Sequence, residues 1–412
     1  MAKEKVEIKT PFKQMMDWLF SQYDFKRDLL KNAVHFKPTG DKEFKELTDD
    51  DINTISITME LKGLKKFAEK DICRAIYSSF NPGNYDPLKT YFNRISKKNP
   101  KGAIDKLAAT IKTTNTELWN KYLKKWLVAC VANYMEIKGC QNHTCLVLTG
   151  GQGKGKTTWL NGICPPELNP AYIYTGRLDL SKQSDTNFKL ADYWFINIEE
   201  QMKNLNRQDA NAVKALITLS DIKGRKPYGR IEVSARRLAN FMGSTNDDDF
   251  ITDETGSRRF LPFKVTDINL PGFKKIDIDE VWSEAFRLYE SGFVYWITQD
   301  DQIELEANNK EYINHTQEHE YVNIYCSVPK DETDATHVVP ASVLRDFIQF
   351  ETTNKNLRDR NIGVALSQIG FKQVTHRFHW ITYPMKAWLI KLNEPTGNAS
   401  LNKYLIEPQQ KS

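Results

Sequence analysis

Eight consecutive residues between an apolar run and a helical pattern have the composition of a phosphate-binding loop. They fit the pattern G-x-x-x-x-G-K-[ST] and are Gly150, Gly151, Gln152, Gly153, Lys154, Gly155, Lys156 and Thr157. Glycines let backbone amides curl around phosphate oxygens, and the helix that follows adds the partial positive charge of its amino terminus. The sequence therefore predicts an ATP site in which Lys156 reaches the β- and γ-phosphates, Thr157 ligates Mg²⁺, and Thr158 completes the contact. The alternative is a glycine-rich turn that binds nothing.

Two carboxylates end a second apolar run about forty residues further along the chain. Residues 193–198 are followed directly by Glu199 and Glu200. A buried parallel strand would carry both side chains to the sheet edge where the phosphate loop lies. We expect Glu199 to hold the metal ion and Glu200 to act as the general base that polarises the attacking water. The alternative is an ordinary strand that happens to end in acids.

A third apolar run ends in an amide side chain. Residues 238–242 precede Gly-Ser-Thr and then Asn246. If this run is the next strand of the same sheet, Asn246 reaches the same edge and could sense the γ-phosphate and align the water. The alternative is a plain turn.

Positive charge is concentrated between Asp221 and Asn240, where six cations face two acids, a net charge of +4. A tyrosine within a Pro-Tyr-Gly turn lies among them, and it could stack on a base while the cations contact phosphates. The expected DNA contacts are Lys223, Arg225, Lys226, Tyr228, Arg230, Arg236 and Arg237. The alternative is a solvated basic face.

Three buried strands with functional loops at their carboxyl ends indicate an α/β core with a parallel sheet. Residues 114–136 carry an amphipathic helical pattern, and Thr114 and Glu117 have the spacing of a capping box. We expect an accessory domain over residues 1–100, which includes an alternating segment near residues 53–59, and an ATPase core over 101–300.

The remainder, residues 301–412, is expected to contain a linker and a small winged-helix-like module. Residues 340–350 and 357–369 have helical patterns, and residues 371–383 alternate like a hairpin. This order of two helices and a hairpin is the basis for the winged-helix interpretation.

The composition excludes several classes of protein. The chain has 412 residues, of which 40% are hydrophobic and 27% charged, so it can form a sizeable core and is not disordered throughout. It contains no run of about 18 apolar residues, and its first ten residues are charged where a signal peptide is apolar. We expect a cytoplasmic protein with no membrane partner.

The three motifs together resemble the A, B and C motifs of superfamily 3 helicases. Residues 194–200, 225–230 and 255–260 further resemble the virulence-associated protein E family, which is found in phages and mobile genetic elements. The resemblance covers about residues 115–290. Glu199 departs from the family, which often has aspartate at this position, so Glu199 would hold the metal ion through water.

The resemblance implies an ATP-dependent DNA helicase that serves the replication of a phage or mobile element. Such proteins assemble as a hexameric ring with ATP between subunits and single-stranded DNA through the centre. Arg258 and Arg259 match the position of the arginine finger, and residues 223–237 match that of the pore hairpin. Related proteins often carry a primase ahead of the helicase, but we expect none in this chain, so a separate primase or initiator is a candidate partner.

Two other classes of function are compatible with the sequence. One is a P-loop ATPase that acts as a switch or remodeller of protein partners without moving along DNA. The other is a non-catalytic, DNA-binding replication initiator that recognises DNA through its carboxy-terminal module. Stimulation of ATP hydrolysis by single-stranded DNA would separate the helicase from both.

Overall fold

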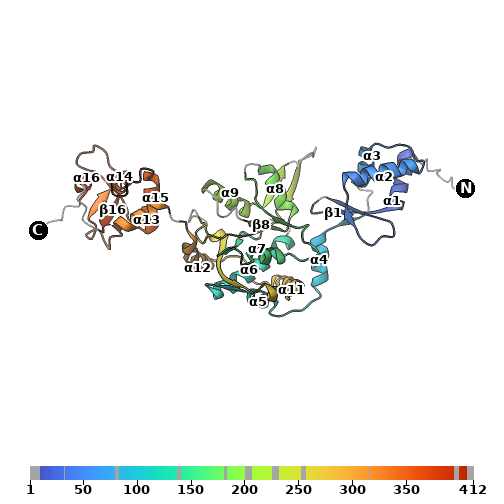
Figure 1. The fold of residues 1–412 in the computed structure, drawn as a ribbon, viewed down its shortest axis with the longest axis horizontal. Helices are drawn as coiled ribbons and strands as arrows, with labels where there is room; N and C mark the ends of the chain where they lie inside the picture. The colour runs from blue at the N-terminus through green and yellow to red at the C-terminus, as the bar shows by residue number, and fades with distance from the viewer. Residues whose placement is uncertain are drawn as a thin grey trace. The chain divides into compact units, whose positions relative to one another are not determined.

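A computed structural model describes residues 10–31, 33–78, 83–136, 141–180, 183–199, 207–224, 232–251, 257–314, 316–393 and 399–405. The chain divides into two units, Met1–Tyr312 and Ile313–Ser412 (Figure 1). Each unit has its own cluster of buried hydrophobic side chains. The boundary expected after residue 300 falls inside helix α12 (Gln299–Asn309), and the division follows Tyr312. No helix in these ranges has both the length and the apolar character needed to cross a lipid bilayer.

The first unit is built around a six-stranded sheet with the order β5–β12–β6–β11–β8–β7. Every neighbouring pair is parallel except β5 with β12. The strands are β5 (Ile111–Thr113), β6 (Cys145–Thr149), β7 (Ile173–Thr175), β8 (Phe195–Glu199), β11 (Asn240–Ser244) and β12 (Phe260–Ile268). The three apolar runs predicted as strands are thus confirmed as β6, β8 and β11, each displaced by one or two residues. The expectation of a mixed α/β fold with a parallel sheet is also confirmed.

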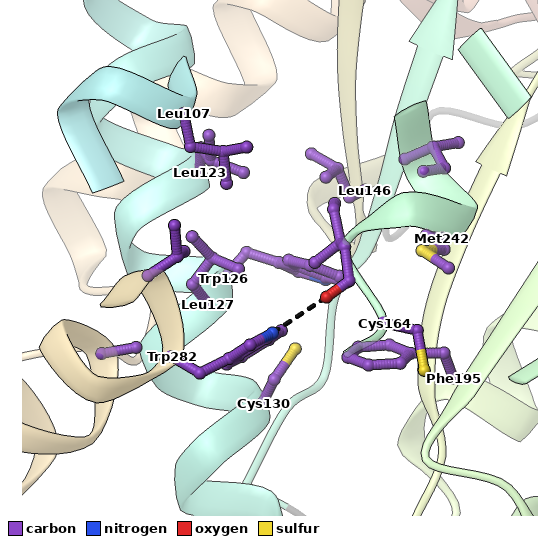
Figure 2. Close-up of a cluster of buried hydrophobic side chains, with 14 of the residues drawn as sticks. Leu107, Leu123, Trp126, Leu127, Cys130, Leu146, Cys164, Phe195, Met242 and Trp282 are labelled. Carbon is purple, nitrogen blue, oxygen red and sulfur yellow. Dashed lines mark hydrogen bonds between the residues drawn. The ribbon is translucent and has the colours of Figure 1, made fainter. Parts of the chain in front are cut away.

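Helices cover this sheet with large aromatic side chains. Figure 2 shows Trp126 and Leu127 of α6 (Thr116–Met135) and Trp282 of α11 (Ile278–Glu290) facing strand residues that include Leu146. Trp126 and Trp282 are both completely or almost completely buried. The indole Nε1 of Trp282 donates to the Ile163 carbonyl at 2.9 Å, so the ring is buried without leaving its polar atom unsatisfied.

The amino-terminal cap of α6 differs from the expected capping box. Asn115, not Thr114, is the cap, and its side chain accepts a hydrogen bond from the Leu118 amide at 3.1 Å. The Thr114 amide instead donates to the Lys264 carbonyl at 3.1 Å, which extends the pairing of β5 with β12. The backbone of Thr114 is therefore part of the sheet pairing, and the helix begins one residue later than a capping box starting at Thr114 would place it.

Ahead of this core, a smaller four-stranded sheet packs against three helices. The sheet has the order β3–β2–β1–β4. Its elements are α1 (Pro11–Gln22), β1 (Tyr23–Asp28), β2 (Val34–Pro38), β3 (Lys45–Glu46), α2 (Asp49–Leu61), α3 (Glu69–Ile76) and β4 (Asn84–Tyr85). The alternating segment near residues 53–59 lies inside α2. Thr48 and Asp51 form a capping box there and acids fill the first turn, so the local signals for a helix outweigh the alternation.

The other elements of the first unit connect and flank the central sheet. They are α4 (Pro87–Ile95), α5 (Ala103–Ala108), α7 (Lys156–Gly162), α8 (Gln183–Asp192), α9 (Arg207–Thr218), β9 (Asp221–Gly224), β10 (Val233–Arg236) and α10 (Leu270–Phe273), in addition to α12.

The described residues of the second unit form four helices and an antiparallel sheet in which β16 pairs with β13, β14 and β15. Its elements are α13 (Gln317–Tyr325), β13 (Cys326–Ser327), β14 (His337–Val339), α14 (Ala341–Thr352), α15 (Asp359–Ile369), β15 (Gln373–His376), β16 (Met385–Leu392) and α16 (Ala399–Asn402). The two expected helices correspond to α14 and α15. The residues predicted as a hairpin, 371–383, hold only its first strand, β15, and the connection, because the second strand, β16, begins at Met385.

A buried ion pair joins α6 to the start of α12. Lys125 Nζ lies 2.8 Å from one Asp301 oxygen, and Lys121 Nζ lies 2.8 Å from the other. Asp301 also accepts from the Thr298 amide and hydroxyl in a capping box. Burial alone would raise the pKa of Asp301, but the hydrogen bonds from Lys121 and Lys125 outweigh it and hold this pKa well below its ordinary value.

We predict that Asp301→Asn lowers the free energy of unfolding by about 3 kcal/mol at pH 7, because it leaves Lys125 buried without its counter-charge. A carboxylate with a lowered folded-state pKa stabilises the protein above its unfolded pKa and loses that effect as the pH falls through the folded value. The gap between wild type and variant should therefore narrow between about pH 4 and pH 2. Urea denaturation across this range measures it.

The exposed neighbour Asp300 provides a matched control, because Asp300→Asn makes the same chemical change without breaking a buried pair. We expect it to change the stability by less than about 0.5 kcal/mol. Equal losses for the two variants would contradict the role of the buried pair.

Candidate functional site

The glycine-rich loop connects the end of β6 to the start of α7, as predicted. Gly150, Gly153 and Gly155 have φ angles of 117°, 78° and 83°, which disfavour residues with a side chain. A Cβ atom on Gly150 would lie 2.8 Å from the Val265 carbonyl oxygen, and one on Gly155 would lie 2.6 Å from the Leu270 side chain. Two of the three glycines therefore also allow close packing of the loop against the elements beside it.

Lys156 is folded into this loop. Its side chain is almost fully buried, and Nζ donates to the carbonyl oxygens of Gly150 (2.6 Å) and Gly151 (2.8 Å) and to Asn246 Oδ1 (3.1 Å). Burial, and then the charge of Lys154, lower the pKa of the Lys156 ammonium. Lys156 and Asn246 belong to two different sequence motifs that were predicted to form one site, and the structure brings them into contact. A positive charge held by a curled backbone at a helix amino terminus suits the binding of a phosphate group.

The sheet register brings the polar last residues of two strands, β11 and β8, level with each other. Ser244, the last residue of β11, pairs with Leu148 of β6 on one side and with Glu199 of β8 on the other. Ser244 Oγ also lies 3.2 Å from Thr157 Oγ1 at the start of α7. Thr157 and Glu199, the two expected metal ligands, therefore flank Ser244 at the carboxyl edge of the sheet. Ser244 was not predicted, although its place at the end of the third apolar run could have identified it.

A second residue that the sequence analysis missed is Asp248, just beyond Asn246. It accepts a hydrogen bond from Thr149 Oγ1 at 2.8 Å and pairs with Lys264 Nζ at 2.6 Å. Burial alone would raise the pKa of Asp248, but the hydrogen bonds from Lys264 and Thr149 lower it. Because Thr149 immediately precedes the loop, this contact fixes the chain that follows Asn246 to the base of the loop.

The exposed loop residue Lys154 is held by hydrogen bonds to the backbone of β12. Its Nζ donates to the carbonyl oxygens of Val265 (3.2 Å) and Thr266 (2.9 Å) on β12. Gln152 and Thr158 are exposed on the loop and the first turn of α7. All nine residues predicted to contact the nucleotide thus lie on one loop and helix start.

Arg258 and Arg259 lie at the opposite edge of the sheet. They form a 3-10 turn directly before β12, whose first residue, Phe260, pairs with Cys145 at the start of β6. Arg258 Nη1 donates to Gln302 Oε1 at 2.9 Å. Both arginines line a cavity of about 260 Å³ together with His143, Trp296 and Gln302. The length of the sheet thus separates these arginines from the loop of their own chain.

The expected basic hairpin is present in part. β9 and β10 pair in antiparallel fashion with Lys223 opposite Ser234. Arg225, Lys226, Tyr228 and Arg230 lie outside the described residues, as does the expected general base Glu200.

Arg236 and Arg237, two of the expected DNA contacts, have partners within the fold. Arg236 binds the carboxyl end of α6, where Nη2 donates to the Tyr134 carbonyl at 2.7 Å and Nη1 donates to the Glu136 carbonyl. The last carbonyls of a helix lack partners within it, so a cation there satisfies a structural need. Arg237 is completely buried, donates to the Asn142 carbonyl and lies over the Phe241 ring. Both guanidinium groups thus take part in the packing of the first unit, and a DNA contact by either one stays a prediction.

The donor set at the loop fits a magnesium–triphosphate complex. Among the described residues, no three His, Cys, Asp or Glu side chains gather into a metal site of their own. Magnesium in proteins is often held by one or two side chains together with phosphate oxygens and water. The Thr157 hydroxyl and the Glu199 carboxylate at one sheet edge could supply those side-chain contacts.

The parallel sheet and the loop define a mixed α/β domain whose polar side chains gather at the carboxyl ends of its strands. The family model of the virulence-associated protein E-like domain matches residues 96–314, just over half of the chain. The chain belongs to this family.

Solved structures of the NrS-1 C-terminal region are similar to the chain over most of its length. An apo structure of residues 305–718 has 15% sequence identity and a TM-score of 0.45. An A form apo structure of the C-terminal region has 14% identity and a TM-score of 0.47. In each comparison 93% of this chain and all of the other are covered. No curated protein matches the chain.

The loop geometry predicts unequal costs for two similar substitutions. A Cβ atom on Gly153 would have no atom within 4 Å. Gly153→Ala should therefore lower the free energy of unfolding only by the backbone strain of a left-handed alanine, about 1 kcal/mol. Gly150→Ala adds a clash with a backbone carbonyl and should cost at least about 2–3 kcal/mol. Urea denaturation of both variants tests the difference. Equal losses of stability would show that Val265 does not constrain the loop.

Proposed function

We propose that the protein is an ATP-dependent motor of the superfamily 3 helicase type that moves along single-stranded DNA and serves the replication of a phage or mobile element. The observation that carries the proposal is the meeting of Lys156, Thr157, Asn246 and Glu199 at one sheet edge. Four side chains from three separate motifs are the set that a triphosphate with a metal ion requires. Membership of the virulence-associated protein E-like family supports the same function.

In the proposed reaction, water attacks the γ-phosphorus of ATP. A bond forms from the water oxygen to phosphorus, the bond to the β-γ bridging oxygen breaks, and ADP leaves. Glu200 takes the proton from the water, while Asn246 aligns the water and Lys156 balances the charge on the phosphates. When bound, Mg²⁺ neutralises charge on the β- and γ-phosphate oxygens, and Thr157 and Glu199 would hold it.

The proposed ring follows from the distance between the two sheet edges. Arg258 and Arg259 precede the first residue of β12, and the loop follows the last residue of β6, with the whole of β6 between these levels. An arginine that assists phosphoryl transfer must reach the γ-phosphate. In this chain it would therefore act on nucleotide held by a neighbouring copy, which supports a closed assembly such as a hexamer.

The β9–β10 hairpin is the proposed DNA contact in the ring. Lys223 lies on β9, and Arg225, Lys226, Tyr228 and Arg230 follow it in the sequence towards β10. Cations with an interleaved aromatic suit a single strand, because phosphates and base faces are both available.

A separate primase or initiator is a proposed partner. We also propose that the second unit is a winged-helix module, since two helices precede a hairpin whose long strand pairs with β14.

The experiment that tests the proposal is the rate of ATP hydrolysis with and without single-stranded DNA. We expect hydrolysis that needs Mg²⁺ and rises when the DNA is added. Hydrolysis that DNA leaves unchanged would contradict a DNA motor and favour a remodeller of proteins. Absence of hydrolysis under both conditions would favour a non-catalytic DNA-binding protein.

Two substitutions should separate nucleotide binding from hydrolysis. Lys156→Ala removes the charge that contacts the phosphates and should abolish turnover and weaken ATP binding. Glu200→Gln keeps the size of the side chain but cannot take a proton, so it should bind ATP and fail to hydrolyse it. Equilibrium binding of a fluorescent ATP analogue and phosphate release measure the two properties. Wild-type turnover by Glu200→Gln would remove Glu200 from its role.

The proposed site between subunits predicts complementation. Alanine at the operative position, Arg258 or Arg259, should leave ATP binding intact and slow hydrolysis by a factor on the order of a thousand. Mixed with Glu200→Gln, it should regain activity, because some interfaces then combine an intact Glu200 from one subunit with an intact arginine from its neighbour. If the variants co-assemble in mass measurements and no activity returns, the arginines do not act between subunits.

A further inference from the structure

The second unit carries a long stretch of sequence without any carboxylate. Residues 360–393 contain no Asp or Glu, and their cations are Arg360, Lys372, Arg377, Lys386 and Lys391. This stretch forms most of α15 and the whole of the β15–β16 hairpin. A surface of this composition faces a polyanion more readily than a neutral partner.

Only some of these cations are neutralised within the fold. Lys372 pairs with Glu332, and Lys391 pairs with Asp334, both at 2.6 Å. The side chains of Arg377 and Lys386 make no ion pair or hydrogen bond with any residue in the described ranges. Both residues are exposed, and they flank the connection between the two strands of the hairpin. The hairpin thus keeps two uncompensated positive charges beside its tip.

The aromatic side chains at the tip decide which form of nucleic acid suits it. Binding to single strands uses open aromatic faces on which bases stack. Here the Trp380 ring stacks on Phe378 with a centroid distance of 5.1 Å, and Lys403 Nζ lies 5.7 Å from the Trp380 ring centre. Intramolecular contacts therefore engage the largest ring of the tip, although Trp380 stays 38% exposed. Tyr383, at 69% exposure, is the one widely exposed Phe, Tyr or Trp ring among the described tip residues, so they do not form a row of open rings on which successive bases could stack.

The shape of the unit fits a duplex. A two-stranded β-ribbon and an α-helix both have widths that a DNA groove admits. α14 and α15 directly precede the hairpin, and α15 packs against α13 and α14. We propose that the β15–β16 hairpin binds the phosphate backbone of double-stranded DNA through Arg377 and Lys386. This contact goes beyond the proposed function, because it lies in a different unit from the ATPase motifs and needs no nucleotide.

The test is the binding of a 20-base-pair duplex to the full chain without nucleotide, followed by fluorescence anisotropy over a range of salt concentrations. The double variant Arg377→Ala/Lys386→Ala should bind the duplex at least about tenfold more weakly at low salt. Because each lost phosphate contact flattens the log-log salt dependence by about 0.9, the slope should fall by about 1.8. A single strand of the same length should lose less affinity than the duplex.

The matched control is Lys62→Ala/Lys65→Ala, which removes two exposed lysines from the first unit and changes the net charge equally. We expect it to bind the duplex within about twofold of wild type. Arg377→Lys, which keeps the charge, should retain most of the affinity, and circular dichroism verifies the fold of each variant. Equal losses for the double variant and the control, no loss in either, or an equal loss for single-stranded DNA would each overturn the proposal.

Discussion

Two ladders of backbone hydrogen bonds, one on each side of β11, set the heights of the strand ends on which the site depends. Because β11 pairs in parallel with both β6 and β8, Leu148, Ser244 and Glu199 come level. A slip of one residue in either ladder would turn Glu199 or Ser244 to the other face of the sheet. The strands resist such a slip, since all five residues of β6 and of β11 are buried and each fits one packing arrangement.

The same sheet separates two groups of charges. The carboxyl edge holds Lys156 within the loop, while the amino edge holds Arg258 beside Gln302. Within one chain the length of β6 lies between these two groups. In the proposed ring, this separation would make hydrolysis depend on assembly.

The parts of the site that could be predicted from sequence are those governed by local patterns. The loop, its strand and its helix follow from glycine spacing next to an apolar run, and β8 and β11 follow from apolar runs of strand length. Residues with a structural partner far along the chain could not be assigned in this way. Arg236 lies in a basic segment that predicts DNA contacts, but its side chain binds the end of α6, about a hundred residues earlier. Ser244 ends an apolar run, a local signal, but its contact with Thr157 joins residues 87 positions apart and could not be predicted from that signal.

The central claim is that the loop and the end of β11 form one magnesium–nucleotide site. Hydrogen–deuterium exchange with a non-hydrolysable ATP analogue tests it directly, because amides that contact phosphates exchange more slowly. With Mg²⁺ present, we expect the analogue to protect residues 150–157 and 244–248 together, and removal of Mg²⁺ by a chelator should reduce the protection. Protection of neither segment, or of regions in the second unit alone, would contradict the account.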